Sequence, residues 1–228
     1  QDNILYDETG KPLTIGKIHS MINRLVAEHS LETPDGFIFS IGRDAGFPHN
    51  SGNSDDLIRL GKTIIFDFYP CERGGGYFFD FTRTWCLGYA DDETVSAYQT
   101  VKRAFYSILD GIQLNTHFYD YQKLVCEFFE GEGYPSVLSS PQTQVGYNHG
   151  LGHGVGLNIH ETPLCRASSG EDDLIRANSI ITVEPGLYFP EKEMGLRLEN
   201  TFQVNTNGEL EPLVEYSDEL IVPMKAGK

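Results

Sequence analysis

The chain has 228 residues, of which 39% are hydrophobic and 22% are charged, and it carries a formal net charge of −16 with a pI near 4.7. This length and composition predict one globular catalytic domain over residues 1–228. Such acidity, without a Lys/Arg-rich run, argues against nucleic acid or an anionic membrane as a partner. The longest apolar runs, TIIFDFY and SIITV, are far shorter than the ~20 residues that cross a bilayer, so we expect no membrane span.

The four cysteines lie far apart, at Cys71, Cys86, Cys126 and Cys165, and form no CxxC motif. This spacing favours neither a thiolate zinc site nor a disulfide framework, so we expect a reducing compartment, the cytoplasm. The chain begins with Gln1 rather than Met. We therefore expect it to be the C-terminal part of a longer protein, and an N-terminal domain and a signal peptide are the two alternatives for what precedes it.

The first half is predicted to contain a helix and a hairpin. Apolar residues at helical spacing, from Ile15 to Val26, predict a helix near 14–29. A polar loop from 42 to 56 carries His49. Two runs rich in β-branched and aromatic residues, 63–69 and 77–85, are separated by CERGGG, which is typical of a hairpin. Asp67 and Asp80 should then face each other on adjacent strands.

The second half repeats this order of elements. A helix is predicted from Asp92, and a third helix has Leu124, Val125, Phe128 and Phe129 on its expected apolar face. The glycine-rich segment HGLGHGVGLNIHE follows, and strands near 179–184 and 196–205 are predicted to form a second hairpin with Glu184 and Glu199. The predicted fold class is α+β, with two pseudo-symmetric halves and a site between their sheets.

The strongest chemical signal is a set of five side chains spread over both halves. Four carboxylates and one imidazole make a mostly hard-oxygen ligand shell, which suits two neighbouring divalent first-row ions better than one tetrahedral zinc. Two such ions acidify a water and polarise a carbonyl, which is the chemistry of hydrolysis. The predicted ligands are Asp67, Asp80, His153, Glu184 and Glu199.

The motifs DFTRT, HGLGHGVGL, VEPGLY and GLRLEN occur in this order. In these motifs the chain resembles the M24 family of two-metal peptidases with the pita-bread fold, which includes methionine aminopeptidase, aminopeptidase P and prolidase, with creatinase as a metal-free relative. The resemblance covers nearly the whole chain. It implies that Asp67 chelates one ion, that Asp80 and Glu199 bridge both, and that His153 and Glu184 complete the second.

The resemblance also implies roles for the residues around the ligands. Glu184 would be both ligand and proton shuttle, and His160 would stabilise the tetrahedral intermediate. His49 would lie near the substrate and His149 on the prolyl side of the cleft. Arg197, two residues before Glu199 on the same strand face, would orient the Glu199 carboxylate.

Within the family, HGLGHG, EPGLY and RLEN favour the proline-cleaving branch. The spacing of the two aspartates, 80 − 67 = 13, is longer than usual, with the surplus in the Gly74-Gly75-Gly76 turn. The family's common glycine two positions after the first aspartate is Tyr69 here. We expect this tyrosine to narrow the pocket.

The predicted function is hydrolysis of the Xaa-Pro bond, in dipeptides or at peptide N-termini, with two Mn²⁺ ions, or Co²⁺, Zn²⁺ or Fe²⁺, as cofactors. The partner is then a peptide with proline at position two, and a homodimer is expected from the resemblance. Two alternatives stay open. The same metal site could serve methionine removal or a non-peptidase lyase, and a chain that had lost turnover would be a peptide-binding module.

Overall fold

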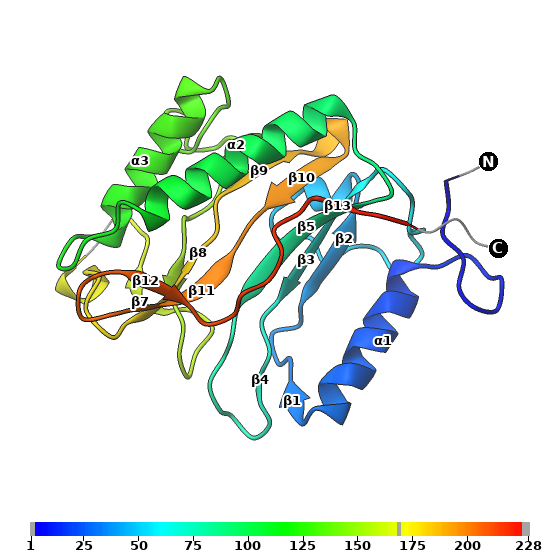
Figure 1. The fold of residues 1–228 in the computed structure, drawn as a ribbon, viewed down its shortest axis with the longest axis horizontal. Coiled ribbons are helices and arrows are strands. Elements are labelled where there is room, and N and C mark those ends of the chain that lie inside the picture. Colours follow the sequence, from blue (N-terminus) through cyan, green and yellow to red (C-terminus); the bar gives the residue numbers. More distant parts are fainter. Residues whose placement is uncertain (1–2, 168–169, 225–228) are drawn as a thin grey trace.

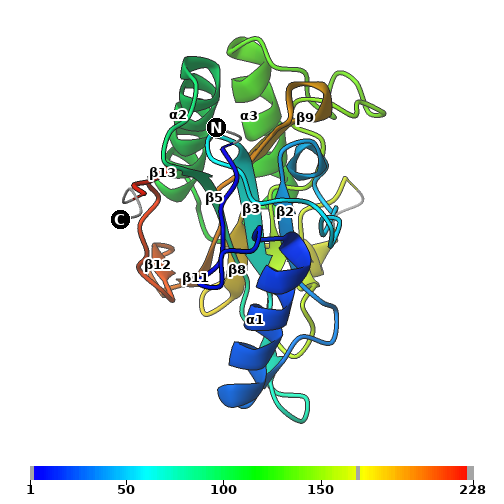
Figure 2. The ribbon, with the colours of Figure 1, turned by 90° about the vertical axis from the view of Figure 1, so that its right-hand side faces the viewer.

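The computed structural model describes residues 3–167 and 170–224 of the chain. Its strands form two main sheets, and the helices lie on the outside of them (Figure 1). Helices α2 and α3 run together along one side, whereas α1 lies alone in front of the first sheet when the molecule is turned (Figure 2). The predicted α+β class is therefore confirmed, and each half has helices on the outside of its sheet.

The first half contains α1 and a four-stranded sheet in the order β13-β5-β3-β2. Helix α1 begins after Thr14, whose hydroxyl accepts a hydrogen bond from the Lys17 amide, as expected of an N-cap. Its apolar stripe packs on one face of the sheet through Ile15. The elements are α1 (Ile15–Glu28), β2 (Ile38–Ile41), β3 (Thr63–Phe68), β5 (Phe81–Leu87) and β13 (Ile221–Val222).

The second half contains two helices and a five-stranded sheet in the order β12-β11-β8-β6-β7. Asp91 caps α2 by accepting from the Thr94 amide, so the helix begins at Asp92 as predicted. The larger of the hydrophobic cores lies between these helices and this sheet. The elements are α2 (Asp92–Leu109), α3 (Phe118–Gly131), β6 (His153–Gly154), β7 (Glu161–Leu164), β8 (Ile180–Val183), β11 (Asn200–Val204) and β12 (Leu210–Pro212).

Short two-stranded ribbons and three-residue 3-10 helices complete the described part of the fold. Strands β9 and β10 form a ribbon that contacts β3 and β5 of the first sheet as well as α2. Strands β1 and β4 pair beside the tip of the first hairpin. These elements are β1 (Leu31–Glu32), β4 (Cys71–Glu72), β9 (Gly186–Phe189), β10 (Met194–Arg197), η1 (Asp44–Gly46), η2 (Glu171–Asp173) and η3 (Pro190–Lys192).

The first hairpin exists, but its register differs from the prediction. Asp67 is paired with Thr82, and Asp80 lies just before β5. Because residues 80 and 82 project to the same face of a strand, Asp80 is the diagonal neighbour of Asp67 rather than its direct partner.

The second predicted hairpin is a bent double ribbon. Its two arms break at the ligand positions, so β8 and β9 flank Glu184-Pro185, and β10 and β11 flank Leu198-Glu199. The Leu198 amide donates to the Pro185 carbonyl at 3.3 Å and holds the two breaks side by side. Since Pro185 has no N–H, it cannot continue the ladder, which explains the interruption.

Helix α3 buries a different stripe from the one predicted. Val125 and Phe129 are buried, but Leu124 is 53% exposed. The buried stripe includes Phe118, Tyr121 and Gln122, at the i, i+3, i+4 spacing of one helical face, and Leu124 falls outside it. None of the helices in the described ranges is long and apolar enough to cross a membrane.

Candidate metal centre

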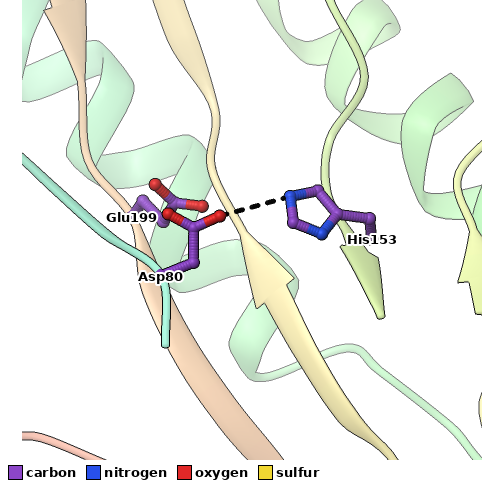
Figure 3. Close-up of side chains that lie close together, drawn as sticks. All are labelled: Asp80, His153 and Glu199. Carbon is purple, nitrogen blue, oxygen red and sulfur yellow. Dashed lines mark ion pairs between the residues drawn. The ribbon is translucent and has the colours of Figure 1, made fainter. Parts of the chain in front are cut away.

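Asp80, His153 and Glu199 come together where the two halves meet (Figure 3). One ligand atom from each lies within 4.8 Å of the others, and all three side chains are buried. Asp80 lies immediately before β5, His153 is in β6 and Glu199 lies at the break before β11. Three elements distant in sequence thus build one potential metal site.

The backbone fixes the orientation of the His153 ring. Its Nδ1 lies 3.1 Å from the Gly154 carbonyl oxygen, which favours the tautomer with hydrogen on Nδ1. The other nitrogen, Nε2, then has a free lone pair and lies 3.5 Å from Asp80 Oδ2 and 3.7 Å from Glu184 Oε1. Burial lowers the pKa of His153 to about 4, so the ring is neutral and suited to bind a metal at neutral pH.

Glu184 and Asp67 complete the set around a cavity of about 450 Å³, which all five predicted ligands line. The Glu184 amide donates to the Leu151 carbonyl at 2.8 Å, which ties the second-half break to the glycine-rich segment. Within that segment, a Cβ at Gly152 or Gly154 would collide with the backbone of Thr182 or Thr162. Glycine at these two positions therefore permits the close approach on which the site depends.

The buried carboxylates lie so close together that cations are needed to balance their negative charges. Burial, followed by the neighbouring Glu199, Asp67 and Glu184 charges, raises the pKa of Asp80 well above its usual value. Burial and nearby carboxylates also raise the pKa of Glu184, and that of Glu199 to about 8. Two of the oxygens, Asp67 Oδ1 and Asp80 Oδ1, are buried without a protein hydrogen-bond partner. Divalent ions would satisfy these oxygens and keep the carboxylates ionised, so this donor set fits the predicted metals.

Arg197 is close to the ligands, but its direct partner differs from the prediction. Its guanidinium donates to Asp67 Oδ2 at 2.5 Å, to the Tyr188 hydroxyl at 2.7 Å and to the Pro48 carbonyl at 3.0 Å. The expected orientation of Glu199 by a direct bond from Arg197 is therefore wrong. Residues 197 and 199 lie on opposite sides of the ribbon break, so they do not share a regular strand face.

Thr82 has the role that was expected of Arg197. Its hydroxyl donates to Glu199 Oε2 at 2.5 Å and accepts from Arg197 Nε at 3.2 Å. A single hydroxyl thus links the ligand to the arginine. The sequence contained a signal for Thr82, because it lies two residues after Asp80 and so on the same strand face.

Burial alone would lower the pKa of Arg197, but Tyr188 and the surrounding carboxylates outweigh it and raise the pKa well above its usual value. Arg197 therefore stays charged and compensates Asp67 in the absence of metal. Tyr188, four residues after Glu184, is fully buried and was not identified from the sequence.

The three predicted accessory histidines occupy two different places. His49 and His160 line the cavity, and the His160 ring stands edge-on to His153 at 4.3 Å between centroids. His149 has its Nδ1 3.8 Å from Glu184 Oε2, and its ring packs between Tyr147 and Tyr188. It borders a second, smaller cavity, and its place on the prolyl side of the substrate cleft stays a prediction.

The model of metallopeptidase family M24 matches residues 11–206, and the chain belongs to this family. It is 31% identical over 175 residues to the Xaa-Pro dipeptidase of Pyrococcus horikoshii, covering 75% of this chain and 44% of that protein. The chain spans about half the length of the curated relatives it matches.

Solved structures agree with the fold. The prolidase of Pyrococcus horikoshii superposes with a TM-score of 0.79 at 24% identity, over 92% of this chain and 56% of that one. The X-Pro aminopeptidase of Thermotoga maritima gives a TM-score of 0.78 at 24% identity, with the same two coverages. The predicted pita-bread fold is thereby confirmed.

Proposed function

We propose that this chain catalyses metal-dependent hydrolysis of the peptide bond between an N-terminal residue and proline. The observation that carries this proposal is the convergence of Asp80, His153 and Glu199 within 4.8 Å in a cavity that Asp67 and Glu184 also line. Two divalent ions held by these five side chains would supply Lewis acidity toward the scissile carbonyl and acidify the attacking water. The mostly oxygen donor set favours Mn²⁺ among first-row ions.

The side chains around the ligands have defined tasks in this proposal. Glu184 accepts the proton of the attacking water and returns it to the prolyl nitrogen as the C–N bond breaks. His160, which lines the cavity beside His153, stabilises the negative charge that develops on the carbonyl oxygen. Arg197 and Thr82 hold Asp67 and Glu199 and thereby position the ligands.

Proline at the second position is supported by two observations. The chain carries HGLGHG, EPGLY and RLEN, and a relative 31% identical over three quarters of the chain is an Xaa-Pro dipeptidase. An Xaa-Pro bond has no N–H, so a strand-like substrate hydrogen bond at this position is absent. The enzyme must therefore recognise the free amino terminus and the ring.

Three finer points belong to the same proposal. The four cysteines are free thiols, which supports the cytoplasm as the compartment. A homodimer is proposed from the family resemblance. An N-terminal domain outside residues 1–228 is proposed because the chain spans about half of its relatives' length.

The test is proline release from Gly-Pro and from longer Xaa-Pro-Xaa peptides by metal-stripped protein with Mn²⁺, Co²⁺ or Zn²⁺ added back. We expect turnover only with metal, and the preferred peptide length then separates dipeptidase from aminopeptidase. Metal binding without turnover on any Xaa-Pro peptide would contradict the proposal and favour the lyase or binding-module alternatives.

A further inference from the structure

Tyr69 lies in the wall of the metal-centre cavity at a position fixed by the first sheet. Ile38 pairs with Asp67, and Asp67 with Thr82, across the three strands. If the register is continued by two residues beyond Asp67, toward the hairpin tip, Tyr69 lies between Gly36 on one side and Asp80 on the other. Residues 67 and 69 project to the same face, so the Tyr69 side chain points into the cavity, which it lines.

The backbone holds Tyr69 firmly in this place. The following residue, Pro70, restricts Tyr69 to an extended conformation. The Pro70 carbonyl accepts a hydrogen bond from the Phe79 amide at 3.0 Å, which closes the hairpin immediately beyond the tyrosine. The ring is half-buried, and its hydroxyl is close enough to Asp67 and Asp80 to feel both charges. The Tyr69 side chain therefore has a fixed position in the cavity wall.

The cavity around Tyr69 has an apolar side and a negative side. Ile38 and Ile159 supply apolar lining of the cavity, whereas the Phe37 ring packs on the α1 side of the sheet against His19. Asp35, in the turn before β2, also lines the cavity, and its charge acts on Tyr69. Asp35 is not one of the predicted metal ligands, so its negative charge would face the positive α-ammonium group of a substrate even when ions compensate Asp67 and Asp80.

We propose that Tyr69 is a specificity-determining residue whose ring limits the size of the substrate's first residue, so that peptides beginning with Gly or Ala are preferred over those beginning with Leu or Phe. This inference rests on the proposed function. The first residue is the one concerned, because its amino group is drawn to the acidic wall that carries Tyr69. A larger side chain in the same place would have to displace a ring that Pro70 and the hairpin hold in position.

The test compares kcat/KM for Gly-Pro, Ala-Pro, Leu-Pro and Phe-Pro in wild type, Tyr69→Ala and Tyr69→Phe. We expect the Leu-Pro to Gly-Pro ratio to rise about 10-fold or more in Tyr69→Ala, the scale of one or two methylenes in a pocket. Tyr69→Phe should keep the wild-type ratio, because the ring remains. Tyr77→Ala is the matched control, since Tyr77 is 68% exposed at the hairpin tip and should leave both ratio and rate unchanged.

A second readout separates this inference from the proposed function. Calorimetry measures the affinity of the metal-free protein for the same dipeptides, without turnover. Tighter binding of Gly-Pro than Leu-Pro that Tyr69→Ala abolishes would support the size limit even if wild type hydrolysed none of them. An unchanged ratio in Tyr69→Ala by both readouts, or no size discrimination in wild type, would overturn the inference.

Discussion

The two pairs of carboxylates, Asp67 with Asp80 and Glu184 with Glu199, come from different halves and are held in different ways. The aspartates belong to a continuous hairpin, whereas the glutamates lie at breaks in a bent double ribbon. The second half also has the larger hydrophobic core. The difference shows that one candidate metal centre combines carboxylates from a regular strand pair with carboxylates from an interrupted one.

The halves also hold each other's ligands. Arg197 of β10 binds Asp67 of β3, and Thr82 of β5 binds Glu199. The Thr201 hydroxyl of β11 donates to the Asp80 carbonyl at 2.6 Å. Glu184 differs, because its backbone is tied within its own half, to Leu151. A change on one side of the interface should therefore weaken ligands on the other, which can be tested.

The largest loss of activity should come from neutralising Asp80, a predicted ligand of the first half that contacts the second half. Asp80→Asn keeps the shape of the side chain and removes its charge. We expect kcat/KM for Gly-Pro to fall about 10³-fold, equivalent to about 4 kcal/mol of lost stabilisation. Asp110→Asn, on the exposed end of α2, is the control and should retain wild-type activity. If the Asp80→Asn protein kept wild-type activity, Asp80 would not be a required metal ligand.

Removing the Arg197–Asp67 ion pair should have a somewhat smaller effect, and this effect should be a loss of folding stability. Arg197→Met leaves Asp67 without its buried partner and removes the cation that compensates the carboxylates. We expect the metal-free protein to lose about 3 kcal/mol in urea unfolding. Arg103→Met, which removes an exposed ion pair with Glu132, should change stability by less than about 1 kcal/mol. Equal losses of unfolding free energy in both variants would contradict the role of Arg197 in joining the two halves.

A smaller effect is expected from the hydroxyl that joins the halves. Thr82→Val keeps the volume of the side chain but removes the bond to Glu199 Oε2. The affinity for Mn²⁺, measured by calorimetry, should fall about 10-fold. Thr100→Val, buried in α2 away from the ligands, should leave the affinity unchanged. If both variants bound Mn²⁺ like wild type, Thr82 would have no part in positioning Glu199.

The last prediction concerns the pH dependence of the metal-free protein. The pKa of Glu199 is raised to about 8 by burial and then by Asp67, so between pH 5 and 8 the folded chain keeps a proton that the unfolded chain has released. Stability should therefore fall as pH rises through this range, and Mn²⁺ should restore it at pH 8. Glu199→Gln should flatten the slope, whereas Glu215→Gln, at an exposed position, should not. A slope that is the same in both variants would be contrary to this account.

The five side chains predicted as ligands line one cavity, and they could be selected from the sequence because their residue types and motifs are local. Asp67 and Asp80 lie in or beside strongly β-prone runs, and His153 is marked by the glycines that its segment requires. The partners of those ligands depend on register and on where a ribbon bends, which periodicity does not encode. That is why Arg197 was assigned to Glu199 instead of Asp67.

The central claim is that side chains from both halves form one site for two metal ions. The most direct measurement is the number of Mn²⁺ ions bound per chain by the metal-stripped protein, in wild type, Asp67→Asn and Glu184→Gln, by calorimetric titration with metal analysis. The account predicts two ions in wild type and the loss or marked weakening of one in each variant. Binding of a single ion by wild type, or of two ions with equal affinity in all three proteins, would contradict it.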